Sequence, residues 1–268
     1  MIQLETIRII NGDYYFDFEH IGSPVGFEYP KAKVTIEDLA GAKSAEYVAS
    51  KFGSRSISWR SLLLEDRLDQ VRTVQKCIRQ GNLKTVKFCS CDLELQTEVE
   101  ILSFSMPPKT GRRPMLIEAV APDWRLYSQI ERTHTLSKTI VYGGMSIPTN
   151  IPLSLSMGSY FNNNVVSYGD QDTNPTFTIQ GPGTKFIIRN NTTDKEFVIT
   201  RTITADQYVK VYVNTGSVLL NDITNIYSSV TGELWALSPD SNVITFYPVG
   251  AGESTLLTIN WRDAYGGI

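Results

Sequence analysis

The stretch Gly232–Pro248, GELWALSPDSNVITFYP, gives the strongest single indication of the fold. Two apolar runs, ELWAL and NVITFY, flank SPDSN, whose residue types all favour turns. This pattern predicts a hairpin that bends at Pro239-Asp240. Leu237 and Ile244 then face a core, and Trp235 packs against it. The alternative is a ligand-binding loop around Trp235 and Asp240.

The rest of the chain from about residue 134 repeats this character. Short runs rich in Val, Ile, Thr, Phe and Tyr are bounded by Gly, Asn, Pro or Asp, a pattern typical of a β-sandwich or barrel. The charge changes at the same point, because only seven of the 25 Lys and Arg residues and ten of the 28 Asp and Glu residues lie from His134 onward. We therefore expect two domains, residues 1–133 and residues 134–268.

The first domain is predicted to contain strands and one helix. Apolar residues at helical spacing mark one face of a helix over about 64–80, namely Leu64, Leu68, Val71, Val74, Cys77 and Ile78. Acidic residues lie early in this segment and basic residues late, as the helix dipole prefers, and Gly81 is a natural stop. Strands are expected at 2–10, 14–18, 56–64, 83–91, 94–106 and 113–122. Residues 38–55 are small and polar and predict a long irregular loop.

Composition excludes several classes of protein. The net charge of −3 gives no indication of a nucleic-acid or membrane partner. The sequence has no apolar run long enough for a transmembrane helix and no pattern of a signal peptide at its start, so we expect assembly in a cytoplasm. Three cysteines, Cys77, Cys89 and Cys91, do not predict a disulfide framework. The Cys89/Cys91 pair has no second pair and no nearby His, so we expect plain buried or half-buried thiols.

A search for catalytic chemistry finds no motif. Neither His20 nor His134 lies in a nucleophile motif, and no phosphate-binding loop or zinc-protease signature occurs. Asp170 and Asp172 could coordinate calcium, but the residues that follow do not complete the EF-hand pattern, so a polar loop is the simpler interpretation. We predict no enzyme activity, no catalytic residues, no cofactor and no metal.

Two pairs of residues are candidates for binding. Arg112 and Arg113 lie together on a loop and could meet an acidic partner or phosphate, although solvated loop charges are the simpler interpretation. Trp235 and Trp261 could stack on sugars if they were exposed, as could Tyr160. Tryptophan in a sandwich strand more often packs in the core.

In their order along the chain, these features resemble the distal tail protein family of long-tailed bacteriophages with non-contractile tails. The chain order of strands, loop, single helix and strands is similar, and so is the close of the first domain, VEILSFSM followed by MLIEAVAPDWRLYSQ, with Pro122-Asp123 and the aromatics Trp124 and Tyr127. The opening stretch matches the family's pattern "apolar-L-x-P-G-x-N-x-I" at Leu237, Pro239, Asn242 and Ile244. Asp240 stands where Gly is usual.

The resemblance implies a mainly β protein with one helix. A split-barrel-like N-terminal α+β ring domain would be followed by a C-terminal galectin-like β-sandwich. It implies a homo-hexameric ring at the virion's tail tip that joins the major tail tube protein to the tail-tip hub and to receptor-binding or peripheral baseplate proteins. The tape measure protein and the genomic DNA would pass through the channel, with no membrane partner. The alternative function is recognition of host cell-wall sugars by the sandwich.

Overall fold

The chain forms two compact units, each with its own core. The computed structural model describes residues 4, 6–19, 21–31, 33–38, 45–63, 68–79, 81–90, 93–106, 113–137 and 162–268. Unit 1 comprises Met1–Gln129 together with Ala264–Ile268, and unit 2 comprises Ile130–Asp263. The boundary expected at 133/134 falls inside a strand, β11 (Arg132–Ser137), which pairs along its whole length within unit 2.

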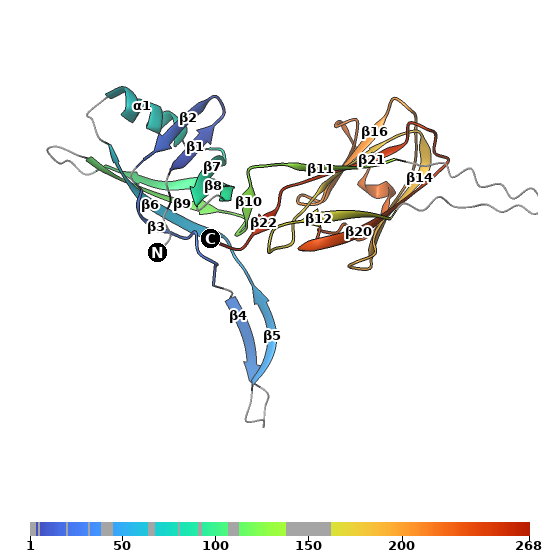
Figure 1. The fold of residues 1–268 in the computed structure, drawn as a ribbon, viewed down its shortest axis with the longest axis horizontal. Coiled ribbons are helices and arrows are strands. Elements are labelled where there is room, and N and C mark those ends of the chain that lie inside the picture. Colours follow the sequence, from blue (N-terminus) through green and yellow to red (C-terminus); the bar gives the residue numbers. More distant parts are fainter. Residues whose placement is uncertain are drawn as a thin grey trace, which may run out of the picture. The chain divides into compact units, whose positions relative to one another are not determined.

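Unit 1 is built on one large antiparallel sheet (Figure 1). Its strands run in the order β2-β1-β7-β8-β9-β6-β3, and β10 pairs with both β8 and β22. The strands are β1 (Ile7–Asn11), β2 (Tyr14–Phe18), β3 (Gly22–Val25), β6 (Arg55–Leu63), β7 (Lys84–Ser90), β8 (Leu93–Ser105), β9 (Arg113–Ala121), β10 (Leu126–Ser128) and β22 (Ala264–Tyr265).

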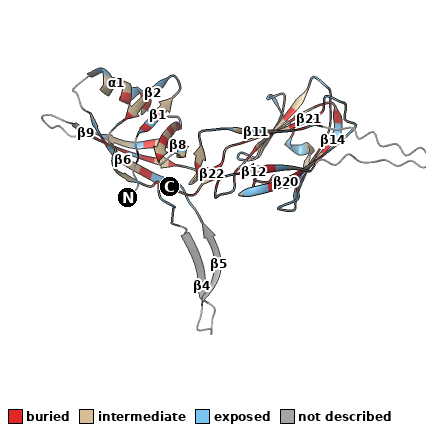
Figure 2. Cartoon of the chain, viewed as in Figure 1, coloured by how far each residue is buried: buried red, intermediate tan, exposed pale blue. Residues whose placement is uncertain are grey.

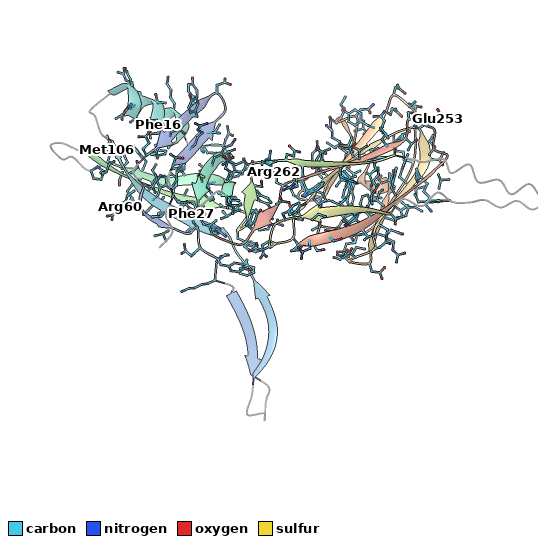
Figure 3. All side chains as sticks on the ribbon, in the orientation of Figure 1. Phe16, Phe27, Arg60, Met106, Glu253 and Arg262 are labelled. Atoms are coloured by element: carbon cyan, nitrogen blue, oxygen red, sulfur yellow. The ribbon has the colours of Figure 1, made fainter. Side chains whose placement is uncertain are left out.

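The long strand β8 joins the two halves of this sheet. Its first half pairs with β7 from Leu93 to Val99, and its second half pairs with β9. The register with β9 shifts between Ile101 and Ser103, so Leu102 is the extra residue of a β-bulge. Alternate residues of β7 and of the first part of β8 are buried. Phe27, which is labelled in Figure 3, packs edge-on against Phe88 in the same core. The six expected strands of this domain are thus present, as β1, β2, β6, β7, β8 and β9.

The predicted helix is confirmed as α1 (Leu68–Cys77), which packs on β1 and β2. Val74 and Cys77 are buried, and Val71 and Ile78 pack against the same core, as the apolar stripe predicted. Leu64 lies outside the described residues. Asp69 lies in the first turn and Lys76 in the last, which favours the helix dipole. Burial raises the pKa of the Cys77 thiol, as expected for a plain core thiol.

The irregular loop expected at 38–55 is wrong for residues 45–51, which form a strand, while residues 39–44 lie outside the described residues. Lys33–Asp38 (β4) and Ala45–Lys51 (β5) pair as a separate two-stranded antiparallel sheet, and β6 begins at Arg55. The prediction failed because the sequence of β5, AEYVASK, is rich in Ala, Ser and Lys, which have low strand propensity. Backbone pairing with β4 overrides this weak local preference.

Unit 2 is a sandwich of two antiparallel sheets around one core. The first sheet has the order β11-β21-β13-β16-β17-β18 and the second has the order β12-β20-β14-β15-β19. Their strands are β12 (Asn162–Ser167), β13 (Thr176–Gln180), β14 (Gly183–Asn190), β15 (Lys195–Ile203), β16 (Tyr208–Tyr212), β17 (Ser217–Leu220), β18 (Thr224–Asn225), β19 (Val230–Gly232), β20 (Asp240–Val249) and β21 (Leu256–Trp261). A short 3-10 helix covers Tyr227–Ser229. Figure 2 shows buried residues alternating with more exposed ones along these strands. The mainly β fold with one α-helix is confirmed for the described part of the chain.

The stretch Gly232–Pro248 does not form the predicted hairpin. Strand β20 pairs with β12 on one side and β14 on the other, so neither edge is open to the ELWAL run. Leu237 instead exchanges two backbone hydrogen bonds with Thr173, at 2.8 and 2.9 Å. The packing was predicted correctly, because Leu237, Ile244 and Trp235 are all buried.

A buried amide pair explains the asparagine in this motif. Asn242 and Asn190 are both fully buried, and the Asn190 Nδ2 donates to the Asn242 Oδ1 at 3.0 Å. The Asn242 side chain also accepts a hydrogen bond from the Ser238 backbone N–H at 3.0 Å and donates to the Ser238 carbonyl at 2.8 Å. A buried amide stabilises the fold only when its donors and acceptors are paired, and here they fix the bend at 238–242.

Asp240 has a backbone φ of +65°, in the left-handed region that favours glycine. We expect Asp240→Gly to raise the free energy of unfolding of unit 2, and Asp240→Ala to lower it, each by about 1 kcal/mol. Two measurements on both variants check this: the midpoint of thermal unfolding, and amide hydrogen exchange in β20. Equal stability of the Gly and Ala variants would contradict the proposed role of the backbone conformation.

Candidate functional site

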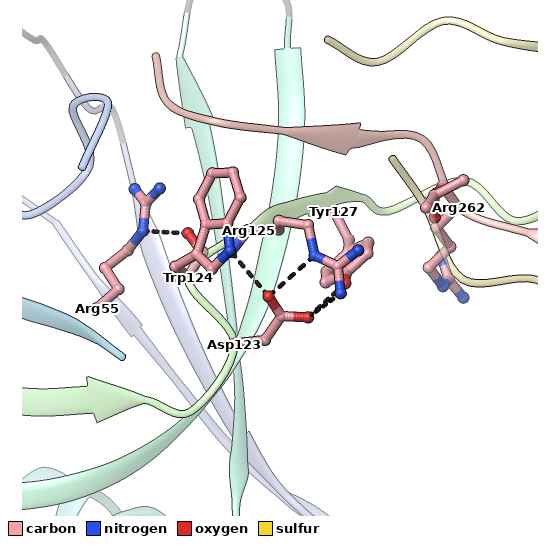
Figure 4. Close-up of polar contacts among 7 residues, drawn as sticks. Arg55, Asp123, Trp124, Arg125, Tyr127 and Arg262 are labelled. Atoms are coloured by element: carbon pink, nitrogen blue, oxygen red, sulfur yellow. Dashed lines mark hydrogen bonds and ion pairs between the residues drawn. The ribbon is translucent and has the colours of Figure 1, made fainter. Parts of the chain in front are cut away.

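A polar cluster follows β9 at the point where the resemblance placed its Asp and aromatic residues. The Arg125 guanidinium binds both carboxylate oxygens of Asp123, at 3.0 Å from Nε to Oδ1 and 2.8 Å from Nη2 to Oδ2 (Figure 4). The Arg125 backbone N–H donates to the same Oδ1 at 3.0 Å, and the Tyr127 hydroxyl donates to Oδ2 at 2.6 Å. The Arg125 guanidinium also lies 5.6 Å from the centroid of the Tyr127 ring, within the range of a cation–π contact.

The electrostatics of this cluster favour an ionised Asp123. Burial alone would raise the pKa of its carboxyl, but the hydrogen bonds from Arg125 and Tyr127 outweigh burial and hold the pKa below its usual value. Burial raises the pKa of the Tyr127 phenol, and its hydrogen bond to Asp123 raises that pKa further. The phenol therefore stays protonated and donates to Asp123 at neutral pH. These interactions fix the chain direction between β9 and β10.

The substitution Asp123→Asn should destabilise unit 1 in a pH-dependent way. The pKa of Asp123 is lowered by folding, so its contribution to stability is present above the unfolded pKa of about 3.9 and is lost as pH falls through the folded pKa. We expect a loss of about 1 kcal/mol at pH 7, since the carboxylate is partly exposed to solvent. Denaturant unfolding of both proteins at pH 7 and pH 3 checks this, and an equal difference at both values would contradict it.

The candidate residues Arg112 and Arg113 are not tested by the structure. Arg112 lies outside the described residues, and Arg113 begins β9. Their role toward an acidic partner therefore stays a prediction.

The candidate sugar-stacking residues lie inside unit 2. Trp235 is 1% exposed and Trp261 is 6% exposed. Trp235 packs edge-on against Phe177, with ring centroids 4.9 Å apart, and also contacts Phe197. Neither indole offers a ring face to a sugar in this structure, so both are corrected to core residues, and the physical reason is the apolar contact that a large ring gains there. Tyr160 lies outside the described residues.

Other candidate ligand sites remain without support in the described residues. No group of three or more His, Cys, Asp or Glu side chains that could hold a metal ion occurs there. Within the same ranges, no helix is long and apolar enough to cross a membrane. A shallow groove of about 360 Å³ lies in unit 1 between α1 and the bulge of β8, lined by apolar and polar side chains including Ile78, Leu102 and Phe104.

Exposed aromatic residues mark the β2 end of the unit 1 sheet. Tyr14 is 49% exposed and Tyr15 is 58% exposed. Lys76 lies 5.1 Å from the ring centroid of Tyr14, and Arg8 lies 5.1 Å from that of Tyr15. Arg8 in turn binds Asp17 at 2.6 and 2.9 Å. Tyrosine and arginine are enriched at protein interfaces. The adjacent tyrosines in the strand predicted at 14–18 were the available sequence signal for this surface.

The comparison with family models decides the identity of unit 2. Residues 168–265 match the siphovirus-type tail component family, C-terminal domain. This part of the chain is therefore similar to a siphovirus-type tail component domain. The match bears out the resemblance to phage distal tail proteins, and it supports a structural component of a phage tail or baseplate. No curated protein sequence matches the chain.

Solved structures extend the likeness of the tail component domain to the fold of the whole chain. SPP1 Dit (gp 19.1), described as a paradigm of the hub adsorption apparatus in phages that infect Gram-positive bacteria, is similar with a TM-score of 0.68 and 11% identity, over 96% of this chain and 98% of that chain. A chain of the phage P2 baseplate in its activated conformation with Ca is similar with a TM-score of 0.50 and 9% identity, over 95% and 97% of the two chains. At these identities the likeness concerns the fold.

Proposed function

We propose that six copies of the chain close into a ring through unit 1, and that this ring lies at the distal end of a phage tail. The match of residues 168–265 to a siphovirus tail component family carries the proposal. It is supported by the fold shared with SPP1 Dit, which is described as part of a hub adsorption apparatus. In this role the protein is an adaptor without catalysis.

The ring would join the tail tube protein on one side to the tail-tip hub or baseplate proteins on the other. The tape measure protein and the genomic DNA would pass through its channel, and unit 2 would hold receptor-binding or peripheral baseplate proteins. Assembly would take place in the host cytoplasm. The segment that includes β4 and β5, and the pair Arg112 and Arg113, are proposed contacts to a neighbouring subunit and to a tail partner.

The sheet of unit 1 supports a ring that closes head to tail. Among the described strands, β2 lies at one end of the sheet and β3 at the other. Within the part of the chain that the structure describes, the outer edge of each end strand pairs with no further strand, so its backbone groups are available for an additional partner. Because the two ends differ in sequence, contact between them is heterologous, and heterologous contacts generate rings when the rotation closes.

The exposed tyrosines of β2 provide the test of this interface. We expect the double variant Tyr14→Ser/Tyr15→Ser to form rings more weakly, since it removes two aromatic contact surfaces while leaving the core intact. Mass photometry of a dilution series measures the loss of rings. The matched control is Tyr227→Ser, which alters a tyrosine that is 54% exposed in unit 2. Rings of unchanged stability in the double variant would exclude the β2 end from the interface.

A further inference from the structure

Residues 264–268 occupy a site in unit 1 although they follow unit 2 in the sequence. Ala264 and Tyr265 pair with Tyr127 and Leu126 of β10 as a short antiparallel ladder. The Ile268 backbone N–H donates to the carbonyl of Phe27 at 3.0 Å. The segment thus makes backbone hydrogen bonds at both of its ends.

Arg55 ties this segment to two other parts of unit 1, residues 26–28 and Trp124. Its side chain is buried, with 3% exposed. The guanidinium donates from Nε to the Trp124 carbonyl at 2.6 Å (Figure 4), from Nη1 to the Gly26 carbonyl at 3.0 Å and from Nη2 to the Gly266 carbonyl. The rigid fork of an arginine suits several acceptors at once. The partners are backbone oxygens, so the site recognises the path of the chain rather than a particular side chain.

Both glycines of the segment lie in close contact with residues 28–29, and backbone contact leaves no room for a side chain at Gly267. A Cβ at Gly267 would lie 2.3 Å from the backbone nitrogen of Tyr29 and 2.7 Å from the carbonyl carbon of Glu28. A Cβ at Gly266 would lie 2.1 Å from the ring of Tyr29. The Tyr29 ring can move away from a Cβ at Gly266. The backbone of Glu28 and Tyr29 cannot move away from a Cβ at Gly267 without disturbing the residues that bind the segment.

Apolar contacts complete the site. Ala264 is fully buried, and Tyr265 and Ile268 pack against the core of unit 1. Tyr29 packs edge-on against Phe52, with ring centroids 5.8 Å apart, and Phe52 lies 4.2 Å from Trp124. These features together describe a cradle, formed by residues 26–29, Arg55 and β10, that fits an extended peptide containing two glycines.

We propose that this cradle is a peptide-binding site whose ligand is the segment Ala264–Ile268, and that filling it completes the ring-forming unit. A ribosome makes residues 1–129 and all of unit 2 before residues 264–268. Unit 1 is therefore completed after unit 2, and a chain that is still growing lacks the segment that binds Arg55. The link to ring formation rests on the proposed function, whereas the binding site rests on the contacts alone.

The test compares the full-length variant Gly267→Ala with the matched control Gly53→Ala. A Cβ at Gly53 meets nothing within 4 Å. Hydrogen exchange followed by mass spectrometry should show loss of amide protection in residues 26–29 and β10 of Gly267→Ala, with β14 and β15 of unit 2 unchanged. A synthetic peptide of residues 262–268, added in excess, should restore that protection, and a peptide carrying the same Gly267→Ala change should not. If Gly267→Ala fails to fold, Ile268→Ala, which removes only an apolar contact, replaces it.

The outcomes separate the two proposals. Unchanged protection in Gly267→Ala, or lost protection that the peptide does not restore, would overturn the binding site. If protection is lost but rings form as in the unaltered protein, completion of the unit by this segment is refuted. If the unaltered protein forms no rings, the proposed function fails, while hydrogen exchange still decides the binding site.

Discussion

The substitution Arg55→Ala is expected to cost unit 1 about 3–5 kcal/mol of unfolding free energy. The change removes a buried guanidinium that donates to the carbonyls of Trp124, Gly26, Glu28 and Gly266. Buried acceptors that lose their donor pay their desolvation cost without compensation. Burial lowers the pKa of Arg55 and nearby Glu28 and Asp123 oppose this shift, so the side chain is held by acceptors in a poorly solvated site.

Hydrogen exchange resolved by segment is the suitable measurement, because a chain of two units need not unfold in one step. The matched control is Arg60→Ala on the same strand, since Arg60 is exposed (Figure 3) and should change stability by less than about 0.5 kcal/mol. Arg55→Lys should recover only part of the loss, because an ammonium group lacks the fork of donors. An Arg55→Ala protein as stable as the Arg60→Ala protein would contradict the account of the cradle.

The substitution Trp235→Ala is expected to cost unit 2 about 3–5 kcal/mol, as truncations of buried aromatic residues do. The indole is fully packed against Phe177 and Phe197, and its truncation leaves a cavity between the sheets. Trp235→Phe should cost less, because the indole N–H has no hydrogen-bond partner to lose among the described residues. Denaturant unfolding with hydrogen exchange in β13 and β15 measures both.

Ile223→Ala is the control for this comparison, since Ile223 is 85% exposed in the same unit. A Trp235→Ala variant that keeps its stability but loses binding to cell-wall polysaccharide would contradict the assignment of Trp235 to the core. That result would return the sugar-binding alternative.

Local sequence patterns were sufficient for elements whose burial is periodic. The stripe through Val71, Val74 and Cys77 located α1, and the alternation in β7 and β8 located those strands. Such patterns arise because one face of an element meets the core. The left-handed backbone at Asp240 was also accessible, because Asp is among the few residues that adopt it.

Features that depend on distant parts of the chain were not accessible. The ELWAL run reads as a strand beside β20, but both edges of β20 are taken by β12 and β14, which lie far away in sequence. In the sequence Arg55 looks like an ordinary charged residue, because one of its acceptors, the Gly266 carbonyl, lies far away along the chain. The Gly266-Gly267 pair was the available signal, since two glycines outside an obvious turn indicate close approach of another backbone.

The state of association of the purified full-length protein tests the central claim most directly. Mass photometry with negative-stain imaging measures particle mass and shape. The account predicts a closed ring with six times the 30.0 kDa mass of the chain. A particle of 30.0 kDa alone, at every concentration and also after addition of tail tubes, would contradict the proposal that this chain forms the ring of a phage tail.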